Sequence, residues 1–349
     1  MSTAPGKTPG SRMRQEIAEQ PDRWEDLLGA EGEHLRGLGE RIRSDPPRLV
    51  LFVARGTSDH AALCASYLVQ TSLGVPSASA SPSVVTTYGA RIDLRDVLVV
   101  AVSQSGESPD IVSYVEMAGS AGATTLGLTN APGSALAGAA QEVVHLRAGP
   151  ETAVAATKSY TAELVALTAL FAPDAVSARL PELGAAAREV LGSAGPAVRE
   201  LAGRYRYATR VMTTGRGYSS ASAREAALKL METSYVSAHG MSAADLLHGP
   251  IALLDASVPL LCFAAAGPDS AAMAELVALG RRHDVDVDVV GDGTVTGATL
   301  PPLLPPGTPP ELRPVLEILP AQLLAAEMAL DRGIDPDEPR RLSKVTRTY

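Results

Sequence analysis

The stretch LVLFVARGTSDHAALCASYLV (49–69) holds the pattern that decides the fold. It runs from an apolar segment through Arg-Gly and a small hydroxyl cluster into an Ala-rich stretch of helical type. The same pattern returns in VMTTGRGYSSASAREAALKLME (211–232), where Gly217 follows Gly56 by 161 residues. Self-similarity at a fixed distance indicates two related structural units in one chain.

A second pair of segments repeats at the same offset. VLVVAVSQSGESPDIVSYVEMA (97–118) and VPLLCFAAAGPDSAAMAELVAL (258–279) place Gly106 and Gly267 161 residues apart. In both units, short apolar runs of strand type alternate with longer amphipathic stretches of helix type. This alternation predicts βαβ units, and therefore an α/β fold with two tandem domains, each a parallel sheet flanked by helices.

The rest of the chain is assigned from its periodicity and its prolines. Helices are expected at about 181–205 and at about 315–332. The segment 300–314 is rich in proline, which interrupts helices and central strands, so a surface loop is expected there. The predicted organisation is a flexible tail at 1–12, a first domain at 13–190, a second domain at 191–333 and a C-terminal tail at 334–349.

Composition excludes several classes of protein. The net charge of −9 argues against a grip on nucleic acid through clustered Lys and Arg. The first residues lack the apolar core of a signal peptide, and no apolar run is long enough to span a membrane. Two cysteines, Cys64 and Cys262, cannot form a disulfide scaffold. We therefore expect a cytoplasmic protein that binds neither nucleic acid nor membrane.

The loop SQSGES (103–108) is the first candidate for ligand binding. Ligands of parallel sheets bind at the carboxyl ends of the strands, and this loop joins an apolar strand to a helix that starts near Pro109. Hydroxyls and backbone N–H groups at a helix N-terminus are typical of a phosphate cradle, and a plain helix cap is the alternative. Thr57 and Ser58 hold the equivalent place after the first strand. No Walker or dinucleotide pattern occurs, so no nucleotide cofactor is expected.

Three charged residues form the second candidate. Glu225, Lys229 and Glu232 are spaced by four and three residues, so they share one strip of a helix. The alternative is an ordinary ladder of ion pairs on a helix surface. The helix follows directly on a candidate ligand loop, however, and a carboxylate in such a place can act as a proton-abstracting base.

Histidine and lysine supply the remaining candidates. His248 lies in a turn ended by Gly-Pro and is suited to moving protons at neutral pH, with a capping or core histidine as the alternative. His239 is a weaker candidate. Lys344 matters only if the C-terminal tail folds back over a site, and otherwise it is a solvated lysine. No metal is expected, because ligand spacing is lacking among His34, His60, His145 and His283 and there is no cysteine cluster.

Taken in order, these segments resemble the sugar isomerase (SIS) family. They are most similar to the isomerase half of glucosamine-6-phosphate synthase (glutamine–fructose-6-phosphate aminotransferase) and to SIS-type glucosamine-6-phosphate deaminases. The matching blocks are MRQEIAEQPDR, ARGTSDHAAL, VSQSGESPDIV, AGPETAVAATKSYTAEL, GRGYSSASAREAALKLMETSY, LLHGPIALLD and GIDPDEPRRLSKVT. The synthase's glutaminase domain has no counterpart in this sequence, so the resemblance implies something other than a full synthase.

The resemblance implies a role for individual residues. Glu232 matches the base that moves a proton between C1 and C2 of the sugar, and Lys229 matches its neighbouring lysine. His248 matches a histidine that assists ring opening from the partner subunit, which implies a homodimer. Lys344 matches a tail lysine that reaches the sugar carbonyl, so the tail is expected over the active site. The residues implied to hold the phosphate or contact the sugar are Ser58, Ser103, Gln104, Ser105, Ser108, Val154 and Ala156.

Two departures from the synthase leave the reaction open. Ala156 stands where the synthase has serine, and SAHGMS, with His239, stands where it has AEAYAA. The expected function is an isomerase or deaminase that acts on a hexosamine 6-phosphate, such as glucosamine 6-phosphate, without a cofactor. The first alternative is a dehydratase of N-acetylglucosamine 6-phosphate that yields a 2,3-unsaturated sugar phosphate. The second is a non-catalytic sugar-phosphate sensor, which the presence of Glu232, His248 and Lys344 disfavours.

Overall fold

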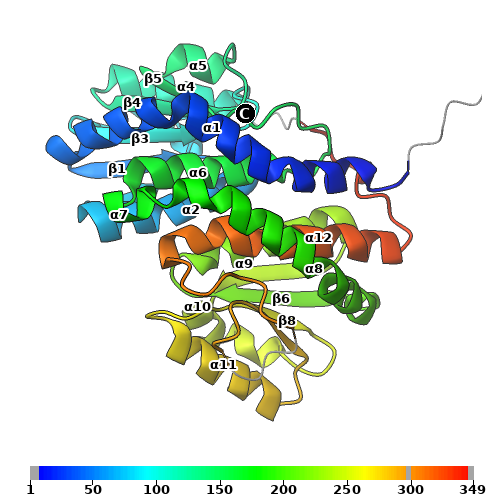
Figure 1. Cartoon of the computed structure of the whole chain (residues 1–349). Helices are drawn as coiled ribbons and strands as arrows, with labels where there is room; N and C mark the ends of the chain where they lie inside the picture. The colour runs from blue at the N-terminus through cyan, green and yellow to red at the C-terminus, as the bar shows by residue number, and fades with distance from the viewer. Residues whose placement is uncertain (1–7, 296–299, 345–349) are drawn as a thin grey trace, which may run out of the picture. The chain divides into compact units, whose positions relative to one another are not determined.

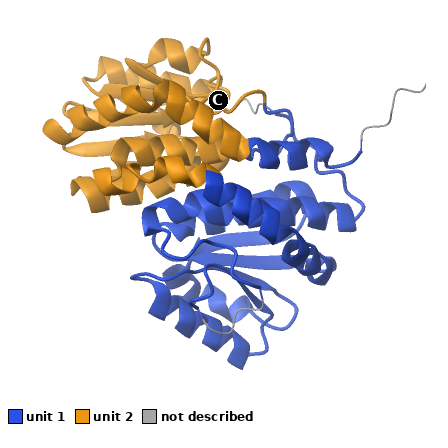
Figure 2. Ribbon diagram, viewed as in Figure 1, with its two compact units in different colours: residues 1–19, 151–157, 185–344 blue, residues 20–150, 158–184, 345–349 orange. Residues whose placement is uncertain are grey.

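The structure, a computed structural model, describes residues 8–295 and 300–344. The chain forms two compact units, and unit 1 contains residues 1–19, 151–157 and 185–344 (Figure 2). The described part of unit 2 is residues 20–150 and 158–184. Residues 1–7 of the expected N-terminal tail and residues 345–349 of the expected C-terminal tail lie outside the described residues.

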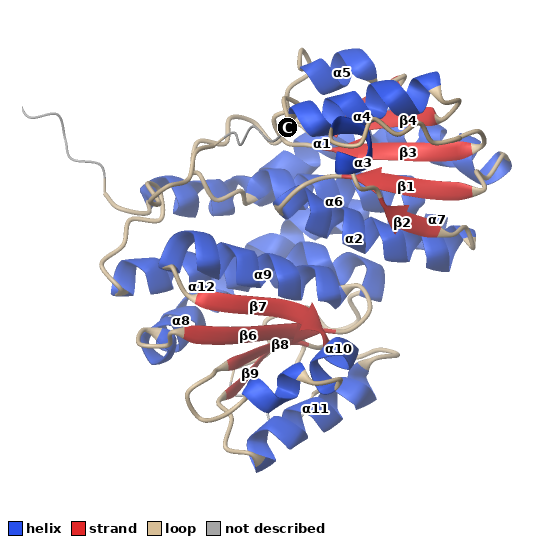
Figure 3. Cartoon of the chain, turned by 180° about the vertical axis from the view of Figure 1, so that it is seen from behind, coloured by secondary structure: helices blue, strands red, loops and turns tan. Residues whose placement is uncertain are grey.

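Unit 2 is built on a parallel sheet with the strand order β2-β1-β3-β4-β5 (Figure 3). The central strand β3 is buried at every position, as expected for a strand covered on both faces. Val99 and Ala101 pack with Ile111 on one face, whereas Phe52 meets Phe171 edge-on, with ring centroids 6.1 Å apart, on the other. The strands are β1 Leu49–Val53, β2 Ser77–Ser79, β3 Val97–Val102, β4 Thr124–Thr129 and β5 Glu142–His145.

Helices cover both faces of this sheet. The face lined by Val99 is covered by α4 and α5, and the face lined by Phe52 by α2 and α6 (Figure 1). The helical elements are α1 Ser11–Ser44, whose first residues belong to unit 1, α2 Thr57–Leu68, η1 Val69–Leu73, α3 Ser83–Thr86, α4 Pro109–Ser120, α5 Ala135–Ala139, α6 Lys158–Phe171, α7 Asp174–Ser177 and η2 Leu180–Glu182.

Unit 1 repeats the arrangement with four parallel strands in the order β7-β6-β8-β9. Leu260 and Cys262 pack with Met273 and Leu276 of α11 on one face, and α9 covers the other, with α12 packed on α9 (Figure 3). The strands are β6 Arg210–Gly215, β7 Ser237–Ser242, β8 Leu260–Phe263 and β9 Val287–Val290. The helical elements are α8 Leu183–Tyr205, α9 Ser219–Ser234, α10 Ala243–Leu247, η3 Pro250–Leu253, α11 Ser270–Arg282, η4 Pro310–Leu312 and α12 Arg313–Asp331.

The strand orders confirm the duplication inferred from the sequence. The first strand of each repeat, β1 or β6, has the short second strand on one side and the third strand on the other. The helices expected at 181–205 and 315–332 are α8 and α12, and the Pro-rich segment is irregular up to the turn η4. Both cysteines are buried thiols without a disulfide. None of the described helices is long and apolar enough to cross a membrane.

Each repeat anchors its first helix with a serine and a buried glutamate. Ser58, in the first turn of α2, donates its hydroxyl to Glu163 of α6 at 2.8 Å. Ser219, the first residue of α9, donates to Glu317 of α12 at 3.1 Å. Burial raises the pKa of Glu317 to about 7, although hydrogen bonds from Ser222 and Ser219 oppose the shift. Such a bond fixes the N-terminus of the helix that leaves the carboxyl end of the first strand.

The raised pKa of Glu317 makes stability depend on pH. Between about pH 4.5 and 7 the unfolded chain loses this proton while the folded chain keeps it, so the contribution of Glu317 to stability falls as pH rises. Glu317→Gln removes that loss. We expect the variant to gain about 2 kcal/mol over the wild type between pH 5 and pH 8, measured by urea unfolding. The exposed Glu116→Gln is the control, and a Glu317→Gln difference that is the same at both pH values would contradict the prediction.

Candidate active site

The loop 103–108 is shaped by its own serine side chains. The hydroxyl of Ser103 accepts the backbone N–H of Gly106 at 3.2 Å, and that of Ser105 accepts the N–H of Glu107 at 3.3 Å. Neighbouring backbone supports the loop from behind, since the carbonyl of Gln104 accepts the N–H of Asn130 at 3.1 Å. The loop is thus ordered by short-range hydrogen bonds at the carboxyl end of β3, where the sequence predicts a ligand.

Gly106 lets the loop lie close to the next βα segment. Its φ is +64°, a conformation that side chains rarely adopt, and a Cβ would lie 2.8 Å from Thr129 Oγ1 and 2.6 Å from Ser134 Cβ. The carbonyl of Gly106 also accepts the N–H of Leu136 at 2.9 Å. A residue with a side chain would push this turn away from β4 and α5.

Ser108 precedes α4 but does not cap it. The residue is extended, Pro109 opens the helix, and the Ser108 side chain makes no capping hydrogen bond. The plain-cap interpretation of this loop therefore does not hold for Ser108. The first turn of α4 offers the backbone N–H groups and the positive end of the helix dipole to an anion.

The loop after β1 is tied to the start of α4 by an ion pair. Arg55 donates to the buried carboxylate of Asp110 through Nε at 3.0 Å, and its Nη2 lies 2.9 Å from the same oxygen. Ser58 uses its hydroxyl proton on Glu163 at 2.8 Å, so toward a ligand it has only its backbone N–H and hydroxyl lone pairs to offer. Thr57 begins α2 directly before it.

The strip on α9 is a buried charge cluster and not a surface ladder. Lys229 Nζ lies 3.3 Å from Glu225 Oε1 and 2.6 Å from Glu232 Oε2. The side chains of Glu225 and Lys229 are fully buried, whereas that of Glu232 is 23% exposed. Burial opposes the charged form of Lys229, but the two carboxylates outweigh it and raise the pKa of the lysine. Glu232 is therefore the member of the strip that a ligand can reach.

The segment 151–157 is held by two buried carboxylates. Glu16 accepts the N–H of Thr152 at 2.5 Å and its hydroxyl at 3.1 Å. Glu151 accepts the N–H of Thr157 at 2.9 Å with one oxygen. These bonds fix the backbone around Val154 and Ala156, whose side chains are half-buried.

Lys344 reaches this segment from the C-terminal tail. Its Nζ donates to Glu151 Oε2 at 2.9 Å and to the carbonyl of Ala153 at 2.8 Å. The tail therefore folds back on unit 1, and Lys344 is not simply a solvated lysine. The structure brings Lys344 next to the Val154–Ala156 stretch, as the resemblance implies.

The two histidines lie apart from the strip on α9. His248 is exposed at the end of α10, which is capped by Ser242 at 3.1 Å from the N–H of Asp245. His239 is exposed in the edge strand β7. A Cβ on the next residue, Gly240, would collide with Ala223 of α9, and neighbouring residues of a strand point to opposite faces. The side chain of His239 therefore points away from α9 and from Glu232.

The repeat of the phosphate loop in unit 1 is filled by the protein itself. Ala265, Ala266 and Pro268 replace the polar residues of the first loop, as the aligned sequences show. The buried Arg313 donates to the carbonyl of Ala266 and lies 3.4 Å from Asp269 Oδ1. A side chain of this protein thus occupies the position where the other repeat offers free donors.

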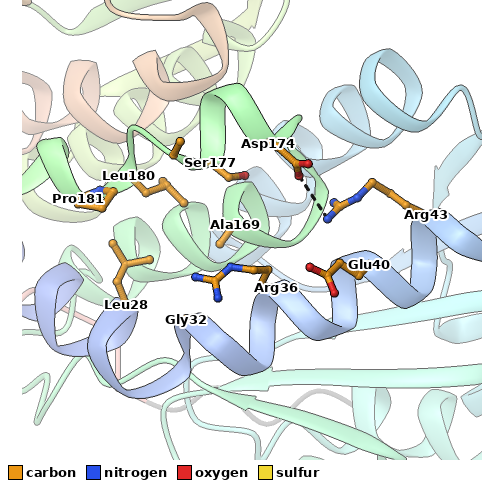
Figure 4. A pocket seen from close by; sticks show the side chains of 11 residues that line it. Leu28, Gly32, Arg36, Glu40, Arg43, Ala169, Asp174, Ser177, Leu180 and Pro181 are labelled. Carbon is orange, nitrogen blue, oxygen red and sulfur yellow. Dashed lines mark ion pairs between the residues drawn. The ribbon is translucent and has the colours of Figure 1, made fainter.

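A cavity of about 450 Å³ in unit 2 contains none of the predicted site residues. It lies between α1 and the α6–η2 connection, with Arg36, Glu40 and Arg43 along one side (Figure 4). Arg43 pairs with Asp174 at 3.5 Å across it. Among residues 8–295 and 300–344, no three His, Cys, Asp or Glu side chains gather as a metal site would require.

The comparison with known families decides the assignment. The SIS domain family matches residues 46–173 and 205–290. The chain belongs to the SIS family. The glutamine–fructose-6-phosphate aminotransferase of Methanothermobacter thermautotrophicus is 33% identical over 95% of this chain and 56% of its own length. That of Gloeobacter violaceus is 35% identical over 95% and 58%. This SIS protein therefore spans little more than half of these curated relatives.

Solved structures agree with the assignment. A Silicibacter pomeroyi protein, whose description as a phosphosugar isomerase is provisional, is 36% identical with a TM-score of 0.81 over 93% of this chain and 99% of its own. The C-terminal domain of the Francisella tularensis glucosamine-fructose-6-phosphate aminotransferase has a TM-score of 0.84 at 24% identity, over 97% and 100% of the two chains. The second likeness concerns the fold alone. The relatives support an enzyme of phosphosugar chemistry.

Several supporting residues escaped the sequence-based reasoning. Glu163, Arg55 with Asp110, Glu16 and Glu151 all hold predicted site residues or their loops in place. Their only local signal was that polar residues stand in otherwise apolar stretches, as Glu163 does in KSYTAELVALTALF. A buried carboxylate needs partners, so such a residue marks a tertiary contact without saying where it is.

Gly106 provides a matched test of the loop. Gly106→Ala adds backbone strain and a collision with Thr129 and Ser134, so we expect it to lower the free energy of unfolding by about 3 kcal/mol. Gly56→Ala shares a positive φ of +56°, but its Cβ would meet nothing within 4 Å, so about 1 kcal/mol is expected. Urea unfolding of both variants makes the comparison. Equal losses would show that the close approach of Gly106 has no energetic effect.

Proposed function

We propose that this SIS protein is an aminosugar-phosphate isomerase or deaminase that abstracts the C2 proton of a hexosamine 6-phosphate such as glucosamine 6-phosphate. The observation that carries the proposal is the strip on α9, where one partly exposed carboxylate is held by a fully buried lysine. Glu232 is assigned as the base, and Lys229 fixes its position at 2.6 Å.

The phosphate is assigned to the loop 103–108. Gln104 and Ser105 are half-buried, and Ser108 keeps its hydroxyl free of helix capping. The backbone N–H groups at the start of α4 add a positive potential that favours a dianion. Ser103 acts from beneath the loop, since its hydroxyl accepts the N–H of Gly106. Thr57 and Ser58 are assigned to the same anion through their backbone at the start of α2.

Lys344 is assigned to the carbonyl end of the open-chain sugar. Its ammonium group lies against Glu151 and the carbonyl of Ala153 and is one-quarter exposed, so it has room to donate to a ligand oxygen. A positive donor at this oxygen stabilises the enolate that forms when C2 loses its proton. Val154 and Ala156 are assigned to contact the sugar beside it.

The balanced reaction follows from these assignments. Glu232 takes the proton from C2 of the open-chain aldose, and reprotonation at C1 gives the ketose or, with an amine on C2, the 2-imine. Water adds to the imine carbon and ammonia leaves, so glucosamine 6-phosphate and water give fructose 6-phosphate and ammonia. Neither an oxidant nor a cofactor is needed, and we assign none.

Dehydration of N-acetylglucosamine 6-phosphate is the second candidate. It is favoured by Ala156, which presents a half-buried methyl group where the synthase has a serine hydroxyl, next to the half-buried Val154. Such a surface suits the methyl group of an acetamide. An acetylated nitrogen leaves poorly, so the same C2 carbanion would expel the C3 hydroxyl as water and form a 2,3-double bond. His239 faces away from Glu232, which makes Ala156 the better candidate for setting this preference.

A homodimer is proposed with His248 acting in the partner's site. His248 is exposed, and the flanking Leu247 and Leu253 are 50% and 51% exposed. Apolar side chains gathered at the surface in this way are typical of a subunit interface. A ring-opening acid at such a place works on the substrate of a second copy.

The substrate is tested by proton NMR in D₂O with glucosamine 6-phosphate and N-acetylglucosamine 6-phosphate in separate tubes. We expect fructose 6-phosphate and ammonia from the first. A vinylic proton from the second alone would replace the deaminase with the dehydratase. Glu232→Gln should lower turnover at least about a thousandfold while ligand binding stays intact. Binding without any turnover by the wild type would identify a sensor instead.

The dimer proposal predicts complementation between two inactive variants. Glu232→Gln and His248→Ala, coexpressed with different tags and purified as a heterodimer, leave one of the two sites with both groups intact. We expect about half of the wild-type activity per heterodimer. A heterodimer as inactive as its parents would mean that His248 acts in its own subunit. Homodimers of each variant are the controls.

A further inference from the structure

The C-terminal tail is fastened to unit 1 well before it reaches Lys344. Asp337 accepts the N–H groups of Arg12 and Met13 at 2.9 and 2.8 Å, and Asp335 accepts that of Gly10 at 2.9 Å. These carboxylates satisfy donors that the start of α1 cannot pair within its own helix. The first fastening point therefore lies seven residues before the lysine.

A second fastening point is Tyr235, the residue that ends α9. Its hydroxyl accepts the backbone N–H of Arg340 at 2.7 Å, and the Arg340 guanidinium lies 4.2 Å from the centre of its ring. Tyr235 has a φ of +55°, which is uncommon for a residue with a side chain. The tail is thus held by a hydrogen bond and a cation–π contact at one ring.

This contact shortens the free path to the lysine. From Arg340 only four residues remain to Lys344, whose Nζ meets Glu151 at 2.9 Å. Tyr235 follows Glu232 by three residues on the same helix. Fixing the tail at Arg340 raises the effective concentration of the lysine at its seat, because fewer residues have to be ordered.

We propose that Tyr235 is a positioning residue that latches the C-terminal tail through Arg340 and so seats Lys344 on Glu151. The catalytic part of this inference rests on the role proposed for Lys344, but the latch itself does not. It links the end of the helix that carries the base to the tail that carries the lysine. Loss of the latch releases Lys344 without disturbing the buried strip on α9.

The lysines of the chain make the latch measurable without any activity assay. Lys344 is 25% exposed, whereas Lys158 and Lys229 are buried. Acetylation by an amine-reactive ester, followed by mass spectrometry, therefore reports the release of Lys344, with the two buried lysines as internal reporters of unfolding. In Tyr235→Phe the ring stays and the hydroxyl acceptor is lost. We expect Lys344 to be acetylated roughly fivefold faster, as loss of one hydrogen bond implies.

A second tyrosine–arginine pair supplies the matched control. Arg206 lies 5.4 Å from the ring of Tyr207, which is 82% exposed. Tyr207→Phe should leave the acetylation of Lys344 unchanged, whereas Glu151→Gln, which removes the charge on its seat, should increase it. Equal acetylation of Lys344 in Tyr235→Phe and the wild type, with Lys229 protected in both, would overturn the latch.

Turnover separates the latch from the proposed function. Tyr235→Phe should lower kcat severalfold with little change in KM, and it should have no further effect on the turnover that remains in Lys344→Ala. Faster acetylation with an unchanged kcat would keep the latch and refute the catalytic role of Lys344. If the wild type turns over no sugar phosphate, the proposed function fails while the acetylation result still decides the latch.

Discussion

The burial of Lys229 is the constraint on which the catalytic helix depends. An ammonium group without water costs several kcal/mol unless carboxylates meet it, and both of its partners come from the same helix, one turn away on either side. Because Glu225 is as buried as the lysine, the cluster has a single outlet, at Glu232. The geometry of the candidate base is therefore a consequence of how a charge is made tolerable inside α9.

The same requirement organises the surroundings of this helix. Its N-terminus is held by Ser219 on the buried Glu317, and near its C-terminus the hydroxyl of Thr233 donates to the carbonyl of Ala325 at 3.1 Å. Both contacts tie α9 to α12, so the strip cannot rotate. Tyr235 then ends the helix and meets the tail. A helix fixed at both ends keeps the carboxylate of Glu232 aimed in one direction, as a base requires.

The sequence predicted what is periodic and local, and it missed what joins distant residues. The offset of 161 residues revealed both sheets, and the spacing of Glu225, Lys229 and Glu232 placed them on one strip. Glu151 and Lys344 are separated by 193 residues, and no pattern in either segment indicates the other. The direction of His239 likewise depends on which face of β7 meets α9, which only the packing against Gly240 fixes.

The filled loop of unit 1 shows how a duplicated architecture came to divide its labour. Arg313 supplies, from inside the protein, the positive charge and the donors that its counterpart loop holds in readiness for a visitor. That copy is self-sufficient, so it stays in shape whether or not substrate is present, and substitutions there are free of selection for recognition. The copy that kept its serines carries recognition alone. Inheritance of one ancestral anion loop has thus yielded a receptor in one half of the chain and a permanently occupied scaffold in the other.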